Sequence, residues 1–223
     1  MQFRYAPEIR SRFPQLCSRA LLVDSFDAKA DPSDEITRLI AIAEDRLAAA
    51  SEGAFPEIQA WRRTFTAMGL KPTQYRCASE ALLRRYRKER TLPTLHPLID
   101  LCNAASLAFA IPVAVFDTGK ITGTLTVQSA HGNEIYESFG GEIENPEPGE
   151  TIFADDDGRA HARRWTNRQS GCSAVRQETS QALIVTEALH DTADKDIAAL
   201  TSSLTQALAA VWPHAAMKEV EPL

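Results

Sequence analysis

The apolar periodicity of the chain changes once, near residue 112, and this change restricts the possible folds more than any other feature. Before it, apolar residues recur at helical spacing in four segments. Asp31-Pro32 and Gly53 are suitable start and stop signals for the first segment, and His96-Pro97 for the start of the last. The four predicted helices lie at about 32–52, 56–68, 79–88 and 98–106.

After residue 112 the chain consists of short segments rich in β-branched and aromatic residues, separated by turns such as Asp157-Gly158. They predict strands at 112–117, 121–128, 133–140, 150–155, 160–167 and 181–189, in addition to one earlier strand at 20–26. A last helix is predicted at about 193–212, before Pro213. Helices followed by strands predict an α+β fold in which mixed β-sheets pack against helices.

The 223 residues can bury one sizeable core, and no internal repeat or low-complexity linker divides them. We therefore expect a single unit over residues 1–223. It would contain a helix-rich half over about 1–110, a strand-rich half over about 111–190 and a C-terminal helix at about 193–212.

The charges are distributed unevenly along the chain. The net charge of −6, taken alone, argues against a dedicated nucleic-acid binder, because such proteins are usually basic. Residues 61–90, however, hold nine Lys or Arg and two acids, whereas residues 134–157 hold nine acids and no Lys or Arg. The first segment is a candidate contact with nucleic acid, and the second is expected to face away from it. The alternative is two solvated faces of opposite charge.

The sequence contains no motif typical of a metal or cofactor site. The four cysteines are Cys17, Cys77, Cys102 and Cys172. They form no C-x-x-C pair, and their wide spacing is typical of buried, reduced thiols. The histidines are isolated, and P-loop and G-x-G-x-x-G motifs are absent, so we expect no metal and no cofactor. A Ser–His–Asp or Cys–His site stays open, because such sites assemble from distant residues.

The sequence shows no sign of a membrane segment. Residues 1–13 lack the apolar stretch of a signal peptide, and no apolar run approaches the ~20 residues that span a bilayer. We therefore expect a cytoplasmic protein with no membrane partner. The sequence does not define an oligomeric state.

Two polar patterns indicate candidate site residues. On the predicted helix at 98–106, Asp100, Asn103 and Ser106 lie three residues apart and share one face. The segment 158–173 combines arginine, tryptophan and amide side chains, which are suited to hydrogen bonds with a polar ligand and to stacking on a nucleobase. As a strand it would place Arg164, Thr166 and Arg168 on one face and Trp165, Asn167 and Gln169 on the other. The alternative is a polar edge strand.

A series of short motifs carries a family resemblance. They are Asp100-Leu101-Cys102-Asn103, Ile111-Pro112 with Val115-Phe116-Asp117, Ile121 with Gly123, and Ala130-His131-Gly132-Asn133-Glu134. Their order and spacing resemble the D-x-T-N helix, the G-Q-P-x-H-A-F-D turn, the I-x-G step and the A-x-x-G-E turn of one editing module. That module is the B3/B4 domain of the beta subunit of bacterial phenylalanyl-tRNA synthetase. The resemblance covers roughly residues 55–190.

The chain also resembles small free-standing relatives of this module. These relatives show a Tyr-Arg-x-x-Ser-Glu-Ala-Leu segment, matched here by residues 75–82, and an Arg-Trp-Asn-x-Arg-Gln-Ser segment, matched by residues 164–170. The catalytic and anticodon-binding parts of the synthetase have no counterpart in these 223 residues, so aminoacylation is not expected.

The resemblance implies a pocket between two subdomains and hydrolysis of the ester that joins a wrong amino acid to the tRNA 3′ end. Two positions depart from the synthetase pattern. The histidine of its G-Q-P-x-H turn falls at Ala114, and its Gly-Gly pair falls near Gln169 and Ser170. The specificity of the synthetase module for tyrosine therefore does not carry over.

The resemblance and the chemistry of the side chains together suggest site residues. An aminoacyl ester is already activated, so a positioned water and a stabilised oxyanion suffice for hydrolysis. The candidate catalytic residues are Asn103, Gln169 and Ser170, for the water or the oxyanion, and Glu80, for the α-ammonium group or as a base. The candidate substrate-binding residues are Arg76, Ser79, Ser106, Arg164, Trp165, Asn167 and Arg168. Arg76 and Arg168 would meet the terminal phosphates.

Three functions follow, in order of preference. The first is a hydrolase that deacylates mischarged aminoacyl-tRNA in trans, with the tRNA 3′ end and the aminoacyl moiety as its partners. The second is a module that binds tRNA or an amino acid without catalysis, which the missing histidine favours. The third is a hydrolase of a small ester or amide unrelated to RNA, which the acidic net charge favours.

Overall fold

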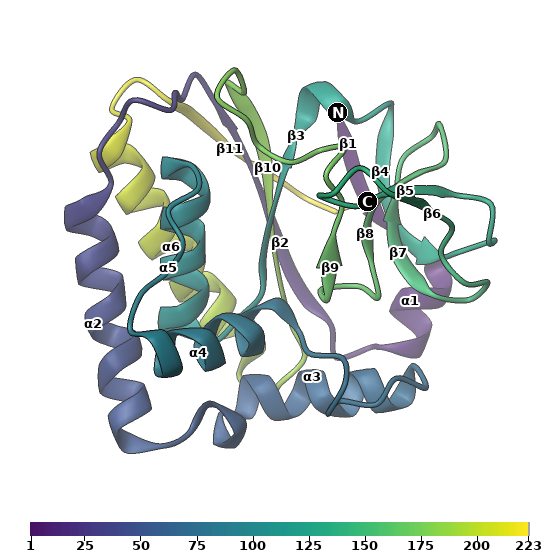
Figure 1. Cartoon of the computed structure of the whole chain (residues 1–223), viewed down its shortest axis with the longest axis horizontal. Coiled ribbons are helices and arrows are strands. Elements are labelled where there is room, and N and C mark those ends of the chain that lie inside the picture. Colours follow the sequence, from purple (N-terminus) through teal and green to yellow (C-terminus); the bar gives the residue numbers. More distant parts are fainter. Residues whose placement is uncertain (223) are drawn as a thin grey trace.

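The computed structural model describes residues 1–222, which form two β-sheets and six α-helices (Figure 1). The first sheet is antiparallel and has the order β11-β2-β10-β3. Its strands are β11 (Ala216–Val220), β2 (Cys17–Asp24), β10 (Gln181–Ala188) and β3 (Val113–Asp117). Strand β10 is buried on both faces, which explains why its sequence is an almost continuous apolar run.

Helices cover one face of this sheet. Helices α5 (Pro97–Phe109) and α6 (Ala193–Val211) pack directly on the strands, and α2 (Ser33–Ala49) packs against the outer side of α5 (Figure 1). Their apolar stripes meet Ala182 and Ile184 of β10 in one hydrophobic core. The side chain of His96 accepts the N–H of Leu98 and so caps α5.

The second sheet faces the other side of β10. It has the order β1-β4-β7-β8-β5-β6, with β9 paired to β8. Its strands are β1 (Gln2–Tyr5), β4 (Thr124–Ser129), β5 (Ile135–Glu137), β6 (Ile143–Glu144), β7 (Thr151–Ala154), β8 (Arg159–Arg163) and β9 (Arg168–Gln169). The sheet is mixed, because β1 runs parallel to β4 and β5 parallel to β8.

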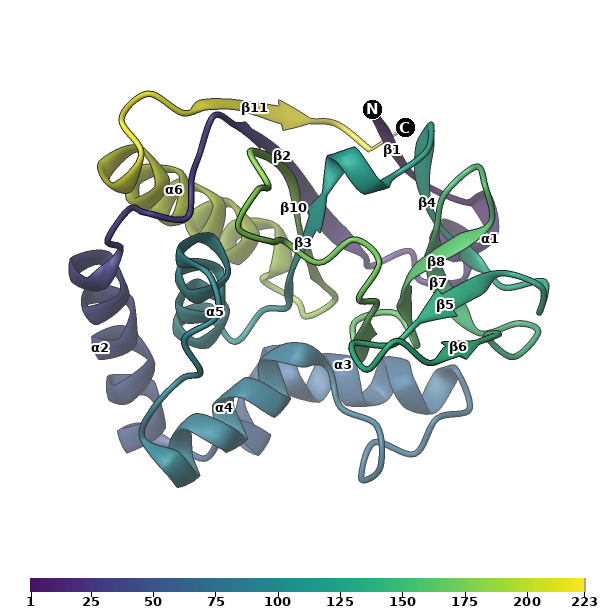
Figure 2. The ribbon, with the colours of Figure 1, turned by 45° about the horizontal axis from the view of Figure 1, so that its top comes forward.

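The remaining helices hold the two sheets together. Helix α1 (Pro7–Arg12) lies beside the second sheet, and α3 (Pro56–Ala67) and α4 (Ala78–Glu89) run along one end of the molecule (Figure 2). Two short 3₁₀ helices, η1 (Glu52–Ala54) and η2 (Thr118–Lys120), complete the elements. The second hydrophobic core combines Trp61 and Phe65 of α3 with Leu183 and Val185 of β10 and with Trp165. β10 therefore has one core on each face.

The predicted α+β class is confirmed, and five of the six helices lie where the apolar periodicity placed them. Strands β1, β6, β9 and β11 and helix α1 were not predicted, and β11 follows the helix at 193–211. Strand β1 has only four residues, and its main partner β4 lies about 120 positions away. The segment Gln2-Phe3-Arg4-Tyr5 alternates polar and apolar residues, but four residues are too few to predict a strand. In residues 1–222, no helix is both long and apolar enough to cross a membrane.

The prediction of one strand over 160–167 is wrong. β8 ends at Arg163, and the next two residues, Arg164 and Trp165, have left-handed backbone angles, with φ of 47° and 58°. The turn is held because Trp165 is fully buried against Trp61 and Phe13. The alternation of side chains expected for this segment is therefore lost.

Candidate functional site

Two adjoining hollows share Asn167 and the two residues of β9. The inner cavity, of about 70 Å³, lies between the two sheets and the start of α4. The outer hollow, of about 540 Å³, opens on the other side of β9 and is also lined by Tyr136, Ser138 and Phe139. These two hollows are the candidates for the pocket that the family resemblance implies.

The walls of the inner cavity are mostly apolar. Val113, Ala114 and Phe116 come from β3, Ala162 comes from β8, and Trp165 comes from the turn after β8. Ala114 is the position to which the family resemblance assigned a histidine. No histidine lines this cavity, so its acid–base chemistry depends on other groups.

Glu187 is the one acidic residue that lines the inner cavity. It lies on the face of β10 that carries Leu183 and Val185, and it is 1% exposed. Its Oε1 accepts hydrogen bonds from the Tyr5 hydroxyl and from the Trp165 indole N–H, each 2.7 Å long. Oε2 accepts none from residues 1–222. Burial raises the pKa of Glu187 from 4.5 to about 7, against the effect of these two donors.

Sequence reasoning missed Glu187. The signal was a single carboxylate inside the apolar strand 181–188. A buried acid in such a strand needs partners, and these come from residues 5 and 165, which are distant in the sequence.

Gln169 separates the inner cavity from the outer hollow. Its side-chain Nε2 donates a 2.6 Å hydrogen bond to the Val115 carbonyl and so joins β9 to β3. Arg168 pairs with Glu144 at 3.1 Å and lies over the ring of Tyr136 at 5.1 Å. Ser170 is buried, and its hydroxyl donates to the Glu137 carbonyl instead of facing either hollow.

The turn after β8 is fastened to the start of α4. The Asn167 side chain donates to the Arg76 carbonyl at 2.7 Å, and the N–H of Ala78 donates to the Thr166 carbonyl at 2.8 Å. The guanidinium group of Arg164 lies over the ring of Tyr75, 4.8 Å from its centre. Segments 75–78 and 164–167 therefore form one joined wall.

A third hollow, called here the arginine hollow, also borders this wall, because Arg76 lines it. It has a volume of about 270 Å³ and is lined by Arg62, Pro72, Thr73, Arg76, Glu80 and Arg84. Glu80 is 1% exposed, and Arg62 binds both of its oxygens, at 2.6 and 3.2 Å. Arg76 and Arg84 each lie 3.7 Å from its Oε1. Glu80 thus gathers three arginines, and its oxygens are already occupied.

Residues 60–206, two thirds of the chain, match the B3/4 domain family. The chain belongs to the B3/4 domain family. The match includes all of the inner cavity and the arginine hollow.

Similar proteins agree with this assignment. The B3/4 chain is 35% identical over 79 residues to the phenylalanine–tRNA ligase beta subunit of Zymomonas mobilis, an overlap of 35% of this chain and 10% of that protein. A crystal structure of an N-terminal fragment of the phenylalanyl-tRNA synthetase beta subunit from Pyrococcus horikoshii has the same fold. Its TM-score is 0.55 at 11% identity, over 100% of this chain and 51% of that fragment. The chain therefore spans a tenth of one relative and about half of the other.

The remaining predicted residues of the B3/4 domain lie elsewhere. Asn103 is half-buried on α5 and lines none of the three hollows described above. The Ser106 hydroxyl donates to the Ile111 carbonyl at 2.7 Å, and buried Ser79 contacts the thiol of Cys77 at 3.4 Å. Asp100 also accepts the N–H of Leu95. Hydrogen bonds to the backbone therefore explain two of the three polar residues on this face of α5, Asp100 and Ser106.

The two charged segments are less one-sided than their sequences suggest. Among the arginines of 61–90, Glu80 and the buried Glu52 neutralise part of the charge, and Arg84 and Arg87 pair with Glu52. In segment 134–157, Glu134 and Asp155 are buried, the side chain of Glu150 is 7% exposed, and all three are hydrogen-bonded. The alternative of a solvated acidic face therefore does not hold for these three residues.

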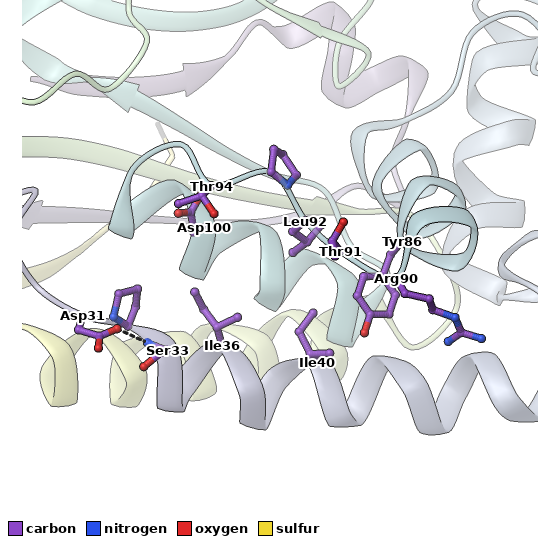
Figure 3. A pocket seen from close by; sticks show the side chains of 12 residues that line it. Asp31, Ser33, Ile36, Ile40, Tyr86, Arg90, Thr91, Leu92, Thr94 and Asp100 are labelled. Atoms are coloured by element: carbon purple, nitrogen blue, oxygen red, sulfur yellow. Dashed lines mark hydrogen bonds between the residues drawn. The ribbon is translucent and has the colours of Figure 1, made fainter.

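Two other groupings of the B3/4 domain were not predicted. A hollow of about 460 Å³ lies between α2 and the loop before α5. Figure 3 shows Ile36, Ile40 and Leu92 among its lining residues. Elsewhere, Glu57, His190 and Asp196 hold ligand atoms within 4.8 Å of one another. These atoms could surround a cation, but His190 already bonds Asp196 at 2.9 Å and Arg46 pairs with Glu57 at 2.7 Å.

Proposed function

We propose that this B3/4 domain deacylates mischarged aminoacyl-tRNA. The tRNA 3′ end would lie on the arginine hollow, and the aminoacyl moiety would enter the inner cavity. Glu187 carries the proposal, because it offers a free carboxylate oxygen inside a cavity whose wall, residues 75–78 and 164–167, also borders the arginine hollow at Arg76. The names of the relatives, which are tRNA ligase beta subunits, support tRNA as the partner.

The inner cavity offers groups suited to ester hydrolysis. A carboxyl group with a pKa of about 7 exists in both protonation states at neutral pH, which suits a general base. Glu187 would accept a proton from a water that attacks the ester carbonyl carbon. The ribose oxygen would leave with a proton, which gives a free amino acid and a deacylated tRNA. Gln169, fixed by Val115, has its Oε1 available to orient the water or the α-ammonium group.

The inner cavity and the arginine hollow would take different parts of an aminoacylated 3′ end. Both border the joined wall formed by residues 75–78 and 164–167, since Arg76 lines the arginine hollow and Ala78 and Asn167 line the inner cavity. Guanidinium groups bind phosphates through paired N–H donors, so Arg76 and Arg84 would hold the backbone while the ester passes into the cavity.

The direct test is hydrolysis of a panel of misacylated tRNAs. The panel should include small amino acids such as alanine and serine, which suit a small cavity, and tyrosine as a large one. We expect release of at least one amino acid faster than in buffer. If no tRNA in the panel is deacylated faster than in buffer, the proposal fails.

Gln169→Ala is expected to slow deacylation at least about tenfold, because the side chain that orients water or amine is lost. Gln128→Ala is the matched control, since Gln128 is also a half-buried glutamine but lies on β4 outside the hollows. Single-turnover rates on the best tRNA would measure both. Asn103→Ala tests the sequence-based candidate directly. A loss with Asn103→Ala and none with Gln169→Ala would place the site on α5 instead.

Arg84→Ala is expected to weaken tRNA binding about three- to tenfold and to flatten its salt dependence. Each lost phosphate contact lowers the slope of log K against log salt by about 0.7 to 0.9. Arg38→Ala is the control, because the Arg38 side chain has nearly the same exposure, 44% against 43%, and lies on α2. A filter-binding titration from low to high salt measures both slopes. Equal slopes for the two variants would remove the arginine hollow from the interface.

A second candidate is a module that binds aminoacyl-tRNA without hydrolysing it. Two observations favour it: Ala114 stands where the resemblance places a histidine, and the amide N–H of Gln169 is already bound to Val115. Binding of a non-hydrolysable aminoacyl-adenosine analogue, together with no release from any tRNA, would identify this function.

A further inference from the structure

Three chemically active side chains meet near β8, outside the site proposed above. The Cys172 sulfur lies 3.5 Å from Nδ1 of His161, and Nε2 of the same ring lies 3.2 Å from Oδ2 of Asp155. They come from the loop after β9, from β8 itself and from the end of β7. A thiol, an imidazole and a carboxylate in this order form the arrangement that activates a nucleophile.

Asp155 is held rigidly in its position. Its Oδ1 accepts the N–H groups of Asp157 and Arg159, and its Oδ2 accepts the N–H of Thr122. Burial acts to raise the pKa of Asp155, but these N–H groups and His161 outweigh it and leave the pKa below its ordinary value. A fixed, ionised carboxylate thus lies beside the imidazole.

The Asp155 carboxylate lies on the Nε2 side of the His161 ring. The ring is fully buried and packs edge-on against Phe116. Within residues 1–222, Nε2 has no hydrogen bond, and Asp155 is its nearest acceptor, although the N–H does not point straight at the oxygen. A proton on Nε2 leaves Nδ1 as the acceptor that faces the thiol.

The surroundings of Cys172 differ from those of the other cysteines. Burial acts to raise the pKa of the Cys172 thiol, but His161 and the Ser170 hydroxyl, 3.2 Å away, outweigh it and lower the pKa. Burial raises the pKa of Cys77 to about 11 and that of Cys102 further, and it also raises the pKa of Cys17. Cys172 is half-buried, so the expectation of buried thiols does not hold for it.

The residue that precedes Cys172 packs against a residue that lines the outer hollow. At Gly171 the chain passes so close to Ser138 that an added Cβ would lie 2.9 Å from the Ser138 carbonyl oxygen. Ser138 lines the outer hollow. In addition, the hydroxyl of Ser173 is buried without a hydrogen-bond partner in the described chain. A donor of this kind beside the thiol is available to a thiolate or to an oxyanion.

We propose that Cys172 is a nucleophile that accepts the acyl group of an activated carboxylic ester, with His161 as its base and Asp155 as the positioning residue. His161 takes the thiol proton, and the sulfur attacks the ester carbonyl carbon. The alcohol leaves with that proton, and an S-acyl bond remains. Water then attacks the thioester with the help of His161, which releases the carboxylic acid and restores the thiol. The proposal goes beyond tRNA deacylation, since it requires no RNA on the ester.

The test uses p-nitrophenyl acetate with the full chain. We expect a burst of nitrophenolate close to one equivalent and an acetyl group on the Cys172 peptide in mass spectra. Cys172→Ser is expected to abolish the burst, whereas Cys17→Ser, the other half-buried thiol, is expected to keep it. Acetylation of other residues only, or an unchanged burst in Cys172→Ser, would overturn the proposal.

A second measurement needs no substitution at the thiol. Alkylation by iodoacetamide across a pH series should modify Cys172 faster than Cys17 and with a lower midpoint pH. His161→Gln, which keeps the ring volume roughly filled, should move the midpoint upward and slow acetylation by about 100-fold or more. A purely structural histidine would leave the midpoint unchanged. Fast alkylation without any S-acetylation would overturn the acyl-transfer role, and equal midpoints for Cys172 and Cys17 would overturn the activation of the thiol.

Discussion

Replacing Arg163 with methionine is expected to lower the free energy of unfolding by about 3–5 kcal/mol, the usual cost of breaking a buried ion pair. Arg163 is 3% exposed and binds both oxygens of Glu150 through Nε and Nη2, each at 2.9 Å. Its Nη1 also contacts Glu144. Methionine fills a similar volume but leaves the buried Glu150 carboxylate without its cation. Urea denaturation at neutral pH would measure the loss.

The matched control also removes the charge of Glu150. Arg163→Met combined with Glu150→Gln should recover a large part of the lost stability, because no uncompensated buried charge remains. Arg159→Met replaces an exposed arginine on the same strand and should cost little. If Arg163→Met costs no more than Arg159→Met, the pair with Glu150 does not stabilise the fold. Arg163 is also connected to the candidate site. Glu144, which contacts Arg163, binds Arg168 as well, and Arg168 lines both the inner cavity and the outer hollow.

Glu187→Gln is expected to remove a stability change of about 3 kcal/mol between pH 4.5 and pH 7. Glu187 has a pKa of about 7 in the folded chain and 4.5 when it is unfolded and exposed. The folded state therefore binds the extra proton between these values. The contribution of Glu187 to the free energy of unfolding therefore falls as pH rises from 4.5 to 7, and it is constant at higher pH. Glutamine can still accept the Tyr5 and Trp165 hydrogen bonds without carrying a charge.

The measurement compares denaturant unfolding of the two proteins at several pH values. The difference in unfolding free energy should shift by about 3 kcal/mol in favour of Glu187→Gln from pH 4.5 to pH 8, because other titrating groups cancel in the comparison. Glu8→Gln, on the exposed start of α1, should show no such shift. A constant difference between wild type and Glu187→Gln would mean that Glu187 has an ordinary pKa and is not suited to the role of a base at neutral pH.

Much of the fold was predictable because it depends on local pattern. Helix α3 was found from the spacing of Ile58, Trp61 and Phe65, and α6 from a long apolar stripe before Pro213. The turn at Arg164 and Trp165 was not predictable, because ordinary strand residues surround it. The Trp165 ring forces the turn, because it packs against Trp61 of α3 and its indole N–H donates to Glu187. Both partners are distant in the sequence.

The candidate site was predictable only in part. The motif 164–170 led to Gln169, Arg168 and Asn167, which share two hollows. Glu80 was selected by the same reasoning, yet it lies among three arginines, because the residues that surround it come from α3 as well as from α4. Glu187 and the Cys172–His161–Asp155 group were not selected, since none belongs to a motif that marks its role.

The sequence by itself determined the α+β class, the positions of most helices and strands and the resemblance to the B3/4 family, because these depend on residue order and periodicity. The tertiary structure decided which side chains act together. Residues 5, 165 and 187 meet at one carboxylate, and residues 155, 161 and 172 meet at one imidazole. The reason is physical: hydrogen bonds and pKa values depend on distances and burial in space, and the pairing of strands sets these distances.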